Sequence, residues 1–196
     1  MKEKRKISLE KTVRIITLAP VSALVCLIMM ACFRWELFGS SGNFFLSVLF
    51  LTVLPVLAYP LQPLIPHFRN EGREGQRNLA MLLAVLGYAS GTAVSFLLDF
   101  PSGLKVFFLT YLFSGFFVAL FNRFFHIRAS GHACGVAGPA AYMLYFLGLP
   151  GLVGIPFLAA VFWASIRMKR HTFVQLVVGS IIPLVSLGLS LLIIPA

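Results

Sequence analysis

Residues 172–194 read TFVQLVVGSIIPLVSLGLSLLII, a run that contains no charged side chain. About 20 helical residues cross the roughly 30 Å hydrocarbon core of a bilayer, so this run predicts a transmembrane helix. In lipid the backbone must satisfy its own polar groups, and no alternating strand pattern occurs in the chain. The sequence therefore predicts an all-α, polytopic membrane helix bundle with six or seven transmembrane helices. The other candidate spans are residues 13–33, 43–65, 78–98, 104–122, 132–148 and 150–166.

The composition excludes several classes of protein. Of 196 residues, 59% are hydrophobic and 11% are charged, whereas a soluble domain carries about 25% charged residues. This excludes a water-soluble enzyme, a disordered chain and a secreted disulfide scaffold. The first apolar run is too long for the core of a signal peptide. We expect a basic N-terminal segment, residues 1–12, followed by a single transmembrane domain, residues 13–196.

The net charge of +10 is carried by clusters between the apolar runs. Such clusters are typical of the loops of a membrane protein, so we expect contacts with membrane lipids and none with nucleic acid. If the spans alternate, one side of the membrane holds 14 of the 16 Lys and Arg residues. The positive-inside rule places that side, and the N-terminus with it, in the cytoplasm of a bacterial inner membrane. The basic connections are the N-terminal segment and residues 66–77, 123–131 and 167–171.

Two histidines lie in these basic connections at the ends of predicted helices. His132 and His171 titrate near neutral pH and could serve as proton donor and nucleophile. Guanidinium groups match phosphate oxygens in pairs, and the N–H groups at a helix start attract anions. A metal site would need carboxylates or more histidines at ligand spacing, so no metal and no cofactor is expected. The candidate phosphate-binding residues are Arg69, Arg73, Arg77, Arg128, Ser130, Gly131 and Arg167.

Basic residues and histidines of these connections also have explanations that involve no catalysis. Lys169 and Arg170 fit contacts with lipid headgroups, and His67 and His126 fit anchors at the membrane interface. The arginines of residues 69–77 could act only as topology determinants, with Glu71 and Glu74 paired to them.

Residues 129–132, Ala-Ser-Gly-His, resemble the P-S-G-H motif of the type 2 phosphatidic acid phosphatase and vanadium haloperoxidase superfamily. Aligning His171 with the histidine of that family's S-R-x5-H-x3-D motif places Gln175 where the family has Asp. The form H-T-x-x-Q is similar to the branch that includes dolichyl-diphosphate phosphatases. The resemblance covers roughly residues 66–180.

The chain departs from the family pattern in two places. The third-motif arginine would fall on Ser165, two residues before Arg167, and no K-x6-R-P motif occurs. Residues 69–77 look like the degenerate first motif of short members, with Arg123 and Arg128 as rival candidates.

The resemblance implies a metal-independent phosphatase that hydrolyses a lipid phosphate or diphosphate, of phosphatidate or polyprenyl type. It assigns the phosphohistidine nucleophile to His171, the acid–base role to His132 and the orientation of His171 to Gln175. Two alternatives stay open. One is a non-catalytic anionic-lipid binder or transporter, which the departures at Ser165 and Gln175 favour. The other is a phosphotransferase that moves a headgroup between lipids with the same histidines. The lipid and the oligomeric state are left open by the sequence.

Overall fold

The computed structural model describes residues 9–124 and 128–195, with Lys11 and Arg73 described by their backbone alone. Throughout these ranges the chain is helical or irregular and forms no strand. The main helices are α1 (Leu9–Ile16), α2 (Ala19–Phe33), α3 (Ser41–Val48), α4 (Leu54–Val56), α5 (Ala58–Leu61), α6 (Pro66–Arg69), α7 (Gly72–Leu97), α8 (Ser102–Phe124), α9 (Gly131–Leu147), α10 (Gly154–Arg167) and α11 (Phe173–Ile193).

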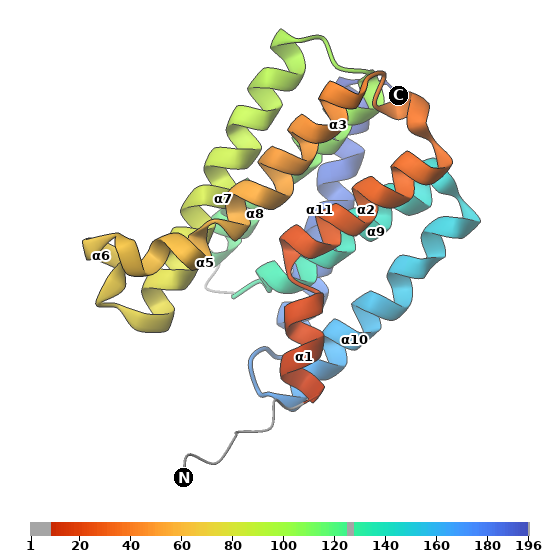
Figure 1. The fold of residues 1–196 in the computed structure, drawn as a ribbon. Coiled ribbons are helices and arrows are strands. Elements are labelled where there is room, and N and C mark those ends of the chain that lie inside the picture. The colour runs from red at the N-terminus through yellow and green to blue at the C-terminus, as the bar shows by residue number, and fades with distance from the viewer. Residues whose placement is uncertain (1–8, 125–127, 196) are drawn as a thin grey trace.

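The described helices confirm an all-α membrane bundle (Figure 1). Five helical segments are long and apolar enough to cross a membrane, and α2 is a shorter apolar helix. The remaining predicted span, residues 132–148, corresponds to α9, which has 17 residues. The five long segments are Ser41–Leu64, Glu74–Leu97, Ser102–Phe124, Leu149–Arg167 and Phe173–Ile193.

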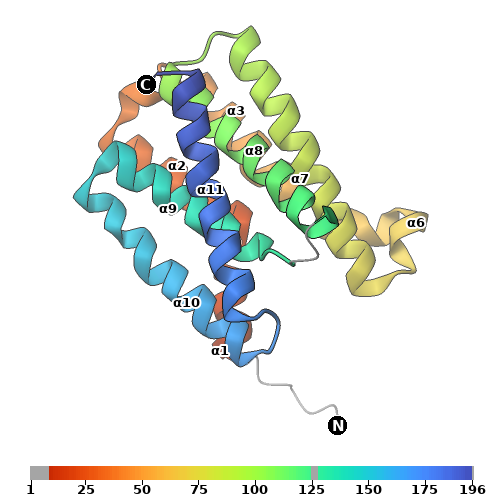
Figure 2. The ribbon, with the colours of Figure 1, turned by 180° about the vertical axis from the view of Figure 1, so that it is seen from behind.

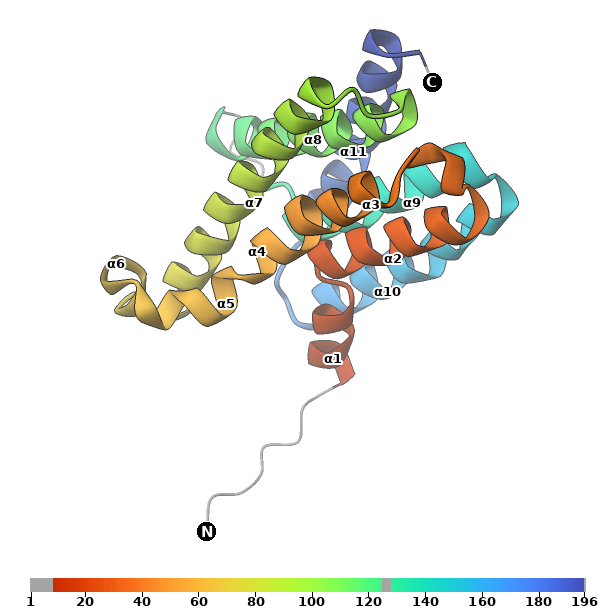
Figure 3. The same cartoon turned by 45° about the horizontal axis from the view of Figure 1, so that its top comes forward.

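The prediction that one continuous helix covers residues 13–33 was wrong for its first residues, because the helix is interrupted between Ile16 and Ala19. α1 ends at Ile16 and α2 begins at Ala19, and α1 runs at an angle to α2 (Figure 3). Pro20 lies in the first turn of α2, where its missing N–H costs nothing, but it cannot continue a helix that arrives from α1. The break turns α1 toward α10, against which it packs.

Helix α9 lies at the centre of the bundle and packs against α2, α8, α10 and α11 (Figures 1 and 2). Small residues allow this close packing. A Cβ added at Gly135 would lie 2.3 Å from the Cβ of Ala19 on α2, and one added at Gly154 of α10 would lie 2.4 Å from the Cβ of Ala140 on α9. The start of α9 is therefore held by neighbours on several sides.

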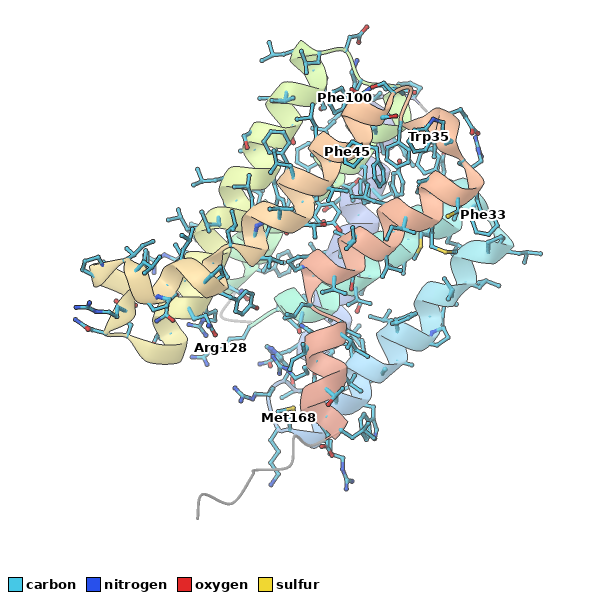
Figure 4. The ribbon with its side chains drawn as sticks, viewed as in Figure 1. Phe33, Trp35, Phe45, Phe100, Arg128 and Met168 are labelled. Carbon is cyan, nitrogen blue, oxygen red and sulfur yellow. The ribbon has the colours of Figure 1, made fainter. Side chains whose placement is uncertain are left out.

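The two ends of the bundle differ in charge. Helix α1, helix α6 and the turn between α10 and α11 lie at one end, and the C-terminus lies at the other (Figures 1 and 2). Arg128 and Met168 are at the first end, and Trp35 and Phe100 are at the second (Figure 4). The cations of the second end are neutralised locally, because Arg34 pairs with Glu36 and Lys105 pairs with Asp99. The excess positive charge of the described chain is thus concentrated at the first end.

Candidate functional site

His171 precedes α11 and is oriented by the first turn of that helix. The hydroxyl of Thr172 accepts a hydrogen bond from the N–H of Gln175 (3.3 Å), and Oε1 of Gln175 accepts one from the N–H of Thr172 (3.2 Å). This reciprocal pair is a capping box. The same Oε1 lies 3.1 Å from Nδ1 of His171. An amide oxygen only accepts, so Nδ1 carries the hydrogen and Nε2 of His171 keeps its lone pair.

The surroundings of His171 favour its uncharged form. Burial lowers the pKa of His171; the hydrogen bond with Gln175 raises it, and the charges of Arg14 and Arg170 lower it again, for a net decrease. At neutral pH the ring is therefore neutral, as a nucleophilic imidazole must be.

His132 lies in the first turn of α9, and its hydrogen-bond partner comes from α1. Its Nε2 lies 2.9 Å from the hydroxyl oxygen of Thr17, a residue that is 1% exposed. Thr17 uses its only hydroxyl hydrogen to donate to the main-chain oxygen of Val13 (2.7 Å). The hydroxyl oxygen must then accept from His132, so Nε2 of His132 carries a hydrogen. The two histidines present opposite capacities on their Nε2 atoms, a donor on His132 and a lone pair on His171.

A backbone contact joins the two motifs. The N–H of Ser130 donates to the main-chain oxygen of Gln175 (3.0 Å), and the buried Ser130 hydroxyl caps α9 by accepting from the N–H of Ala133 (3.2 Å). Gly179 permits the approach, because a Cβ there would lie 2.4 Å from the main-chain oxygen of Ser130. The two histidine motifs therefore meet at the starts of α9 and α11.

Several predicted phosphate-binding residues are not brought to these histidines by any contact in the described structure. Arg69 and Arg128 are exposed, and Arg77 pairs with Glu74 (3.3 Å) on the exposed face of α7. Gly131 is exposed at the start of α9. The side chain of Arg73 and the whole of His126 lie outside the described residues.

Arg167 is engaged elsewhere as well. Its Nε lies 3.3 Å from a carboxylate oxygen of Glu10 on α1, and both residues line a shallow groove of about 850 Å³. A neighbouring open depression of about 330 Å³ is lined by Arg170, His171 and Gln175, among others. Arg170, which the sequence favoured as a headgroup contact, therefore shares a surface with His171.

Sequence reasoning missed two residues, Arg14 of α1 and Thr17, which directly follows that helix. The sequence counted Arg14 in the basic N-terminal cluster and gave Thr17 no role within the predicted span 13–33, yet Thr17 contacts His132 and the charge of Arg14 acts on both histidines. One signal was available. Arg14 lies inside the predicted span 13–33, and an ionisable residue inside an apolar run is by default a candidate for function.

Comparisons with known proteins found no match: no family model, no curated protein and no solved structure matches this chain. Within residues 9–124 and 128–195, no three His, Cys, Asp or Glu side chains come together in a way that could hold a metal ion.

Proposed function

We propose that the protein is an integral-membrane phosphatase that hydrolyses a lipid phosphate or diphosphate without a metal ion. The observation that carries the proposal is the complementary state of the two histidines. Gln175 holds the hydrogen of His171 on Nδ1 and leaves Nε2 free to attack, whereas Thr17 accepts from a hydrogen on Nε2 of His132. A nucleophile and a proton donor on adjacent helix starts suit the two-step transfer of a phosphoryl group.

The proposed first step forms a bond between Nε2 of His171 and phosphorus while the bond from phosphorus to the leaving oxygen breaks. His132, which carries a hydrogen on both ring nitrogens when the phosphoryl dianion is bound, turns its Nε2–H from Thr17 to that oxygen, protonates it as it leaves and becomes neutral. In the second step a water oxygen attacks phosphorus, His132 accepts the water proton, and the N–P bond breaks to release phosphate. Guanidinium groups stabilise the charge on the phosphoryl oxygens in both steps.

A lipid substrate is supported by the position of the site. The histidines lie at the starts of two helices in a membrane bundle, and the depression beside His171 opens at the basic end of that bundle. Lys169 and Arg170 flank it with positive charge, which favours an anionic headgroup at the membrane surface. The same surface would also suit a protein that binds anionic lipids without turnover, so the test must measure chemistry.

The test uses the full chain purified in detergent with EDTA, supplied with phosphatidate and with a polyprenyl diphosphate. We expect phosphate release that is abolished in His171→Ala and reduced about 100-fold or more in His132→Ala. His67→Ala, an exposed histidine at the same end, is the matched control and should retain activity. An acid-labile phosphoenzyme should form with labelled substrate and be absent in His171→Ala.

The outcomes separate the alternatives. Transfer of phosphate to an alcohol acceptor without its release would replace the hydrolase with a phosphotransferase. An absence of both reactions with every lipid phosphate would leave a non-catalytic lipid binder.

A further inference from the structure

Arg14 has a buried polar atom for which residues 9–124 and 128–195 provide no partner. Its Nη1 is inaccessible to solvent and has no hydrogen-bond partner in the described chain. Arg14 precedes Thr17 by three residues on and just beyond α1, so the two side chains share the face that meets His132. A buried guanidinium nitrogen without a partner is costly, and it calls for an acceptor beyond those that the described residues offer.

The charges around Arg14 are positive or neutral. Burial lowers the pKa of Arg14, the charge of Arg170 lowers it further, and Tyr59 of α5 acts in the opposite direction. The charge of Arg14 also acts on His132 and on His171. Two cations, Arg14 of α1 and Arg170 of the turn before α11, therefore act on each other and on His171, and no carboxylate of the described residues is among the groups that act on Arg14.

The acidic side chains of the described chain are engaged elsewhere. Glu10, one turn before Arg14 on α1, pairs with Arg167 of α10. Glu74 pairs with Arg77, and Glu71 accepts from Asn78. Glu36 and Asp99 form their ion pairs at the opposite end of the bundle. Each carboxylate of the described residues thus has another partner, and the charge of Arg14 can meet an added anion.

We infer that α1 supplies the anion-binding arginine of the site, with Nη1 of Arg14 bound to an oxygen of the phosphoryl group that lies between His132 and His171. This inference rests on the proposed function. It assigns to Arg14 the phosphate contact that the sequence analysis predicted for the arginines of residues 69–77. The ligand is a phosphate group, whether it is carried by a lipid or free. A dianion there would satisfy Nη1 and relieve the repulsion between Arg14 and Arg170.

The same helix also holds the acceptor for His132. Thr17 and Arg14 therefore reach the site together, and α1 contributes both a substrate contact and the partner of the proton donor. Docking of α1 on α10 completes the site from a segment far away in sequence from both histidine motifs.

Thermal unfolding of the full chain in detergent, with and without orthophosphate, tests the inference. We expect orthophosphate to raise the Tm of the wild type and of Arg77→Gln, but not of Arg14→Gln, because a ligand that binds only the folded state stabilises it. Without phosphate, Arg14→Gln should be at least as stable as the wild type, because it removes a half-buried charge with one enclosed nitrogen that has no partner in the described chain. A purely structural arginine would give the reverse: a lower Tm without phosphate and an unchanged phosphate shift, which would overturn the inference.

Kinetics with a short-chain phosphatidate separate this inference from the proposed function. Arg14→Gln should raise KM or lower kcat/KM by about tenfold or more, as expected for one lost hydrogen bond to a charged group, with partial rescue in Arg14→Lys. If the wild type hydrolyses the lipid and Arg14→Gln matches it, the inference fails and the phosphatase stands. If no form hydrolyses any lipid phosphate while orthophosphate still stabilises only chains with Arg14, the phosphatase fails and the anion site stands.

A third arm distinguishes the two sources of the phosphate. A Tm shift with short-chain phosphatidate but none with orthophosphate, again dependent on Arg14, would identify the lipid headgroup as the ligand and support the site. Equal shifts in Arg14→Gln and wild type with both ligands would refute it.

Discussion

The main-chain N–H of Ser130 donates to the main-chain oxygen of Gln175 across 3.0 Å, which fixes the start of α9 against the first turn of α11. His132 follows Ser130 by two residues, and His171 is hydrogen-bonded to Gln175 itself. The relative position of the two histidines is therefore set by a backbone contact, which no side-chain substitution at either residue removes.

Gly179→Ala tests that contact. The added Cβ would lie 2.4 Å from the Ser130 oxygen, so the start of α9 must move, at a cost of about 1–3 kcal/mol. We expect a lower Tm together with a loss of activity. Gly188→Ala on the same helix is the control, since nothing lies within 4 Å of its Cβ, and it should be neutral or stabilising. Similar behaviour of the two variants would show that the close approach at Gly179 is unimportant.

Gln175→Glu should shift the pH dependence of catalysis. In the wild type the pKa of His171 is lowered, chiefly by burial, so the acidic limb of kcat/KM should lie below the ordinary histidine value of about 6.5. A carboxylate at position 175 keeps both hydrogen bonds and adds a negative charge, which raises the pKa of His171. The acidic limb should then move to higher pH, because more of the nucleophile is protonated at a given pH. If the acidic limb of kcat/KM lies at the same pH in Gln175→Glu and in the wild type, the group that titrates there is not His171.

Thr17→Val should disturb the orientation of His132, because Thr17 holds the ring in place before the Nε2–H turns to the leaving oxygen. The substitution keeps the shape of the side chain but removes the acceptor of the Nε2–H, which leaves a buried donor unpaired at a cost of about 1–3 kcal/mol. We expect a lower Tm and a lower kcat, with the larger effect on substrates whose leaving group is a basic alkoxide. Thr17→Ser retains the hydroxyl, so its Tm and its kcat should be close to those of the wild type. Equal kcat values in Thr17→Val and wild type would exclude a role for this hydrogen bond.

The positive-inside rule predicts that the basic end, and the site with it, faces the cytoplasm. A single cysteine at the exposed position of Arg77, in a Cys32→Ser background, tests this, because Cys26 and Cys134 are buried. An impermeant thiol reagent should leave intact cells unlabelled and label inverted vesicles. Labelling of intact cells would place the site on the outer face.

The helices could be predicted because long apolar runs follow directly from the thickness of the bilayer. The pairing of His171 with Gln175 could also be predicted, since the four-residue spacing on one helix start is local. The contact of His132 with Thr17 could not, because it depends on the break before Pro20 and on the packing of α1 against α10. The pattern of arginines in residues 69–77 is the same whether they face a substrate or, as with Arg77, an adjacent glutamate.

The short central helix gives this bundle an uneven thickness. With 17 residues, α9 is about 25 Å long, whereas α7 with 26 residues extends to about 39 Å. Because α2, α8, α10 and α11 surround α9, its length need not match the hydrocarbon core of about 30 Å. A bilayer matched to the longer helices α7, α8 and α11 would then leave the start of α9 recessed below the plane of the neighbouring headgroups. A lipid phosphate must sink toward His132 or the membrane must thin around it, so turnover should rise as the acyl chains of the host bilayer are shortened.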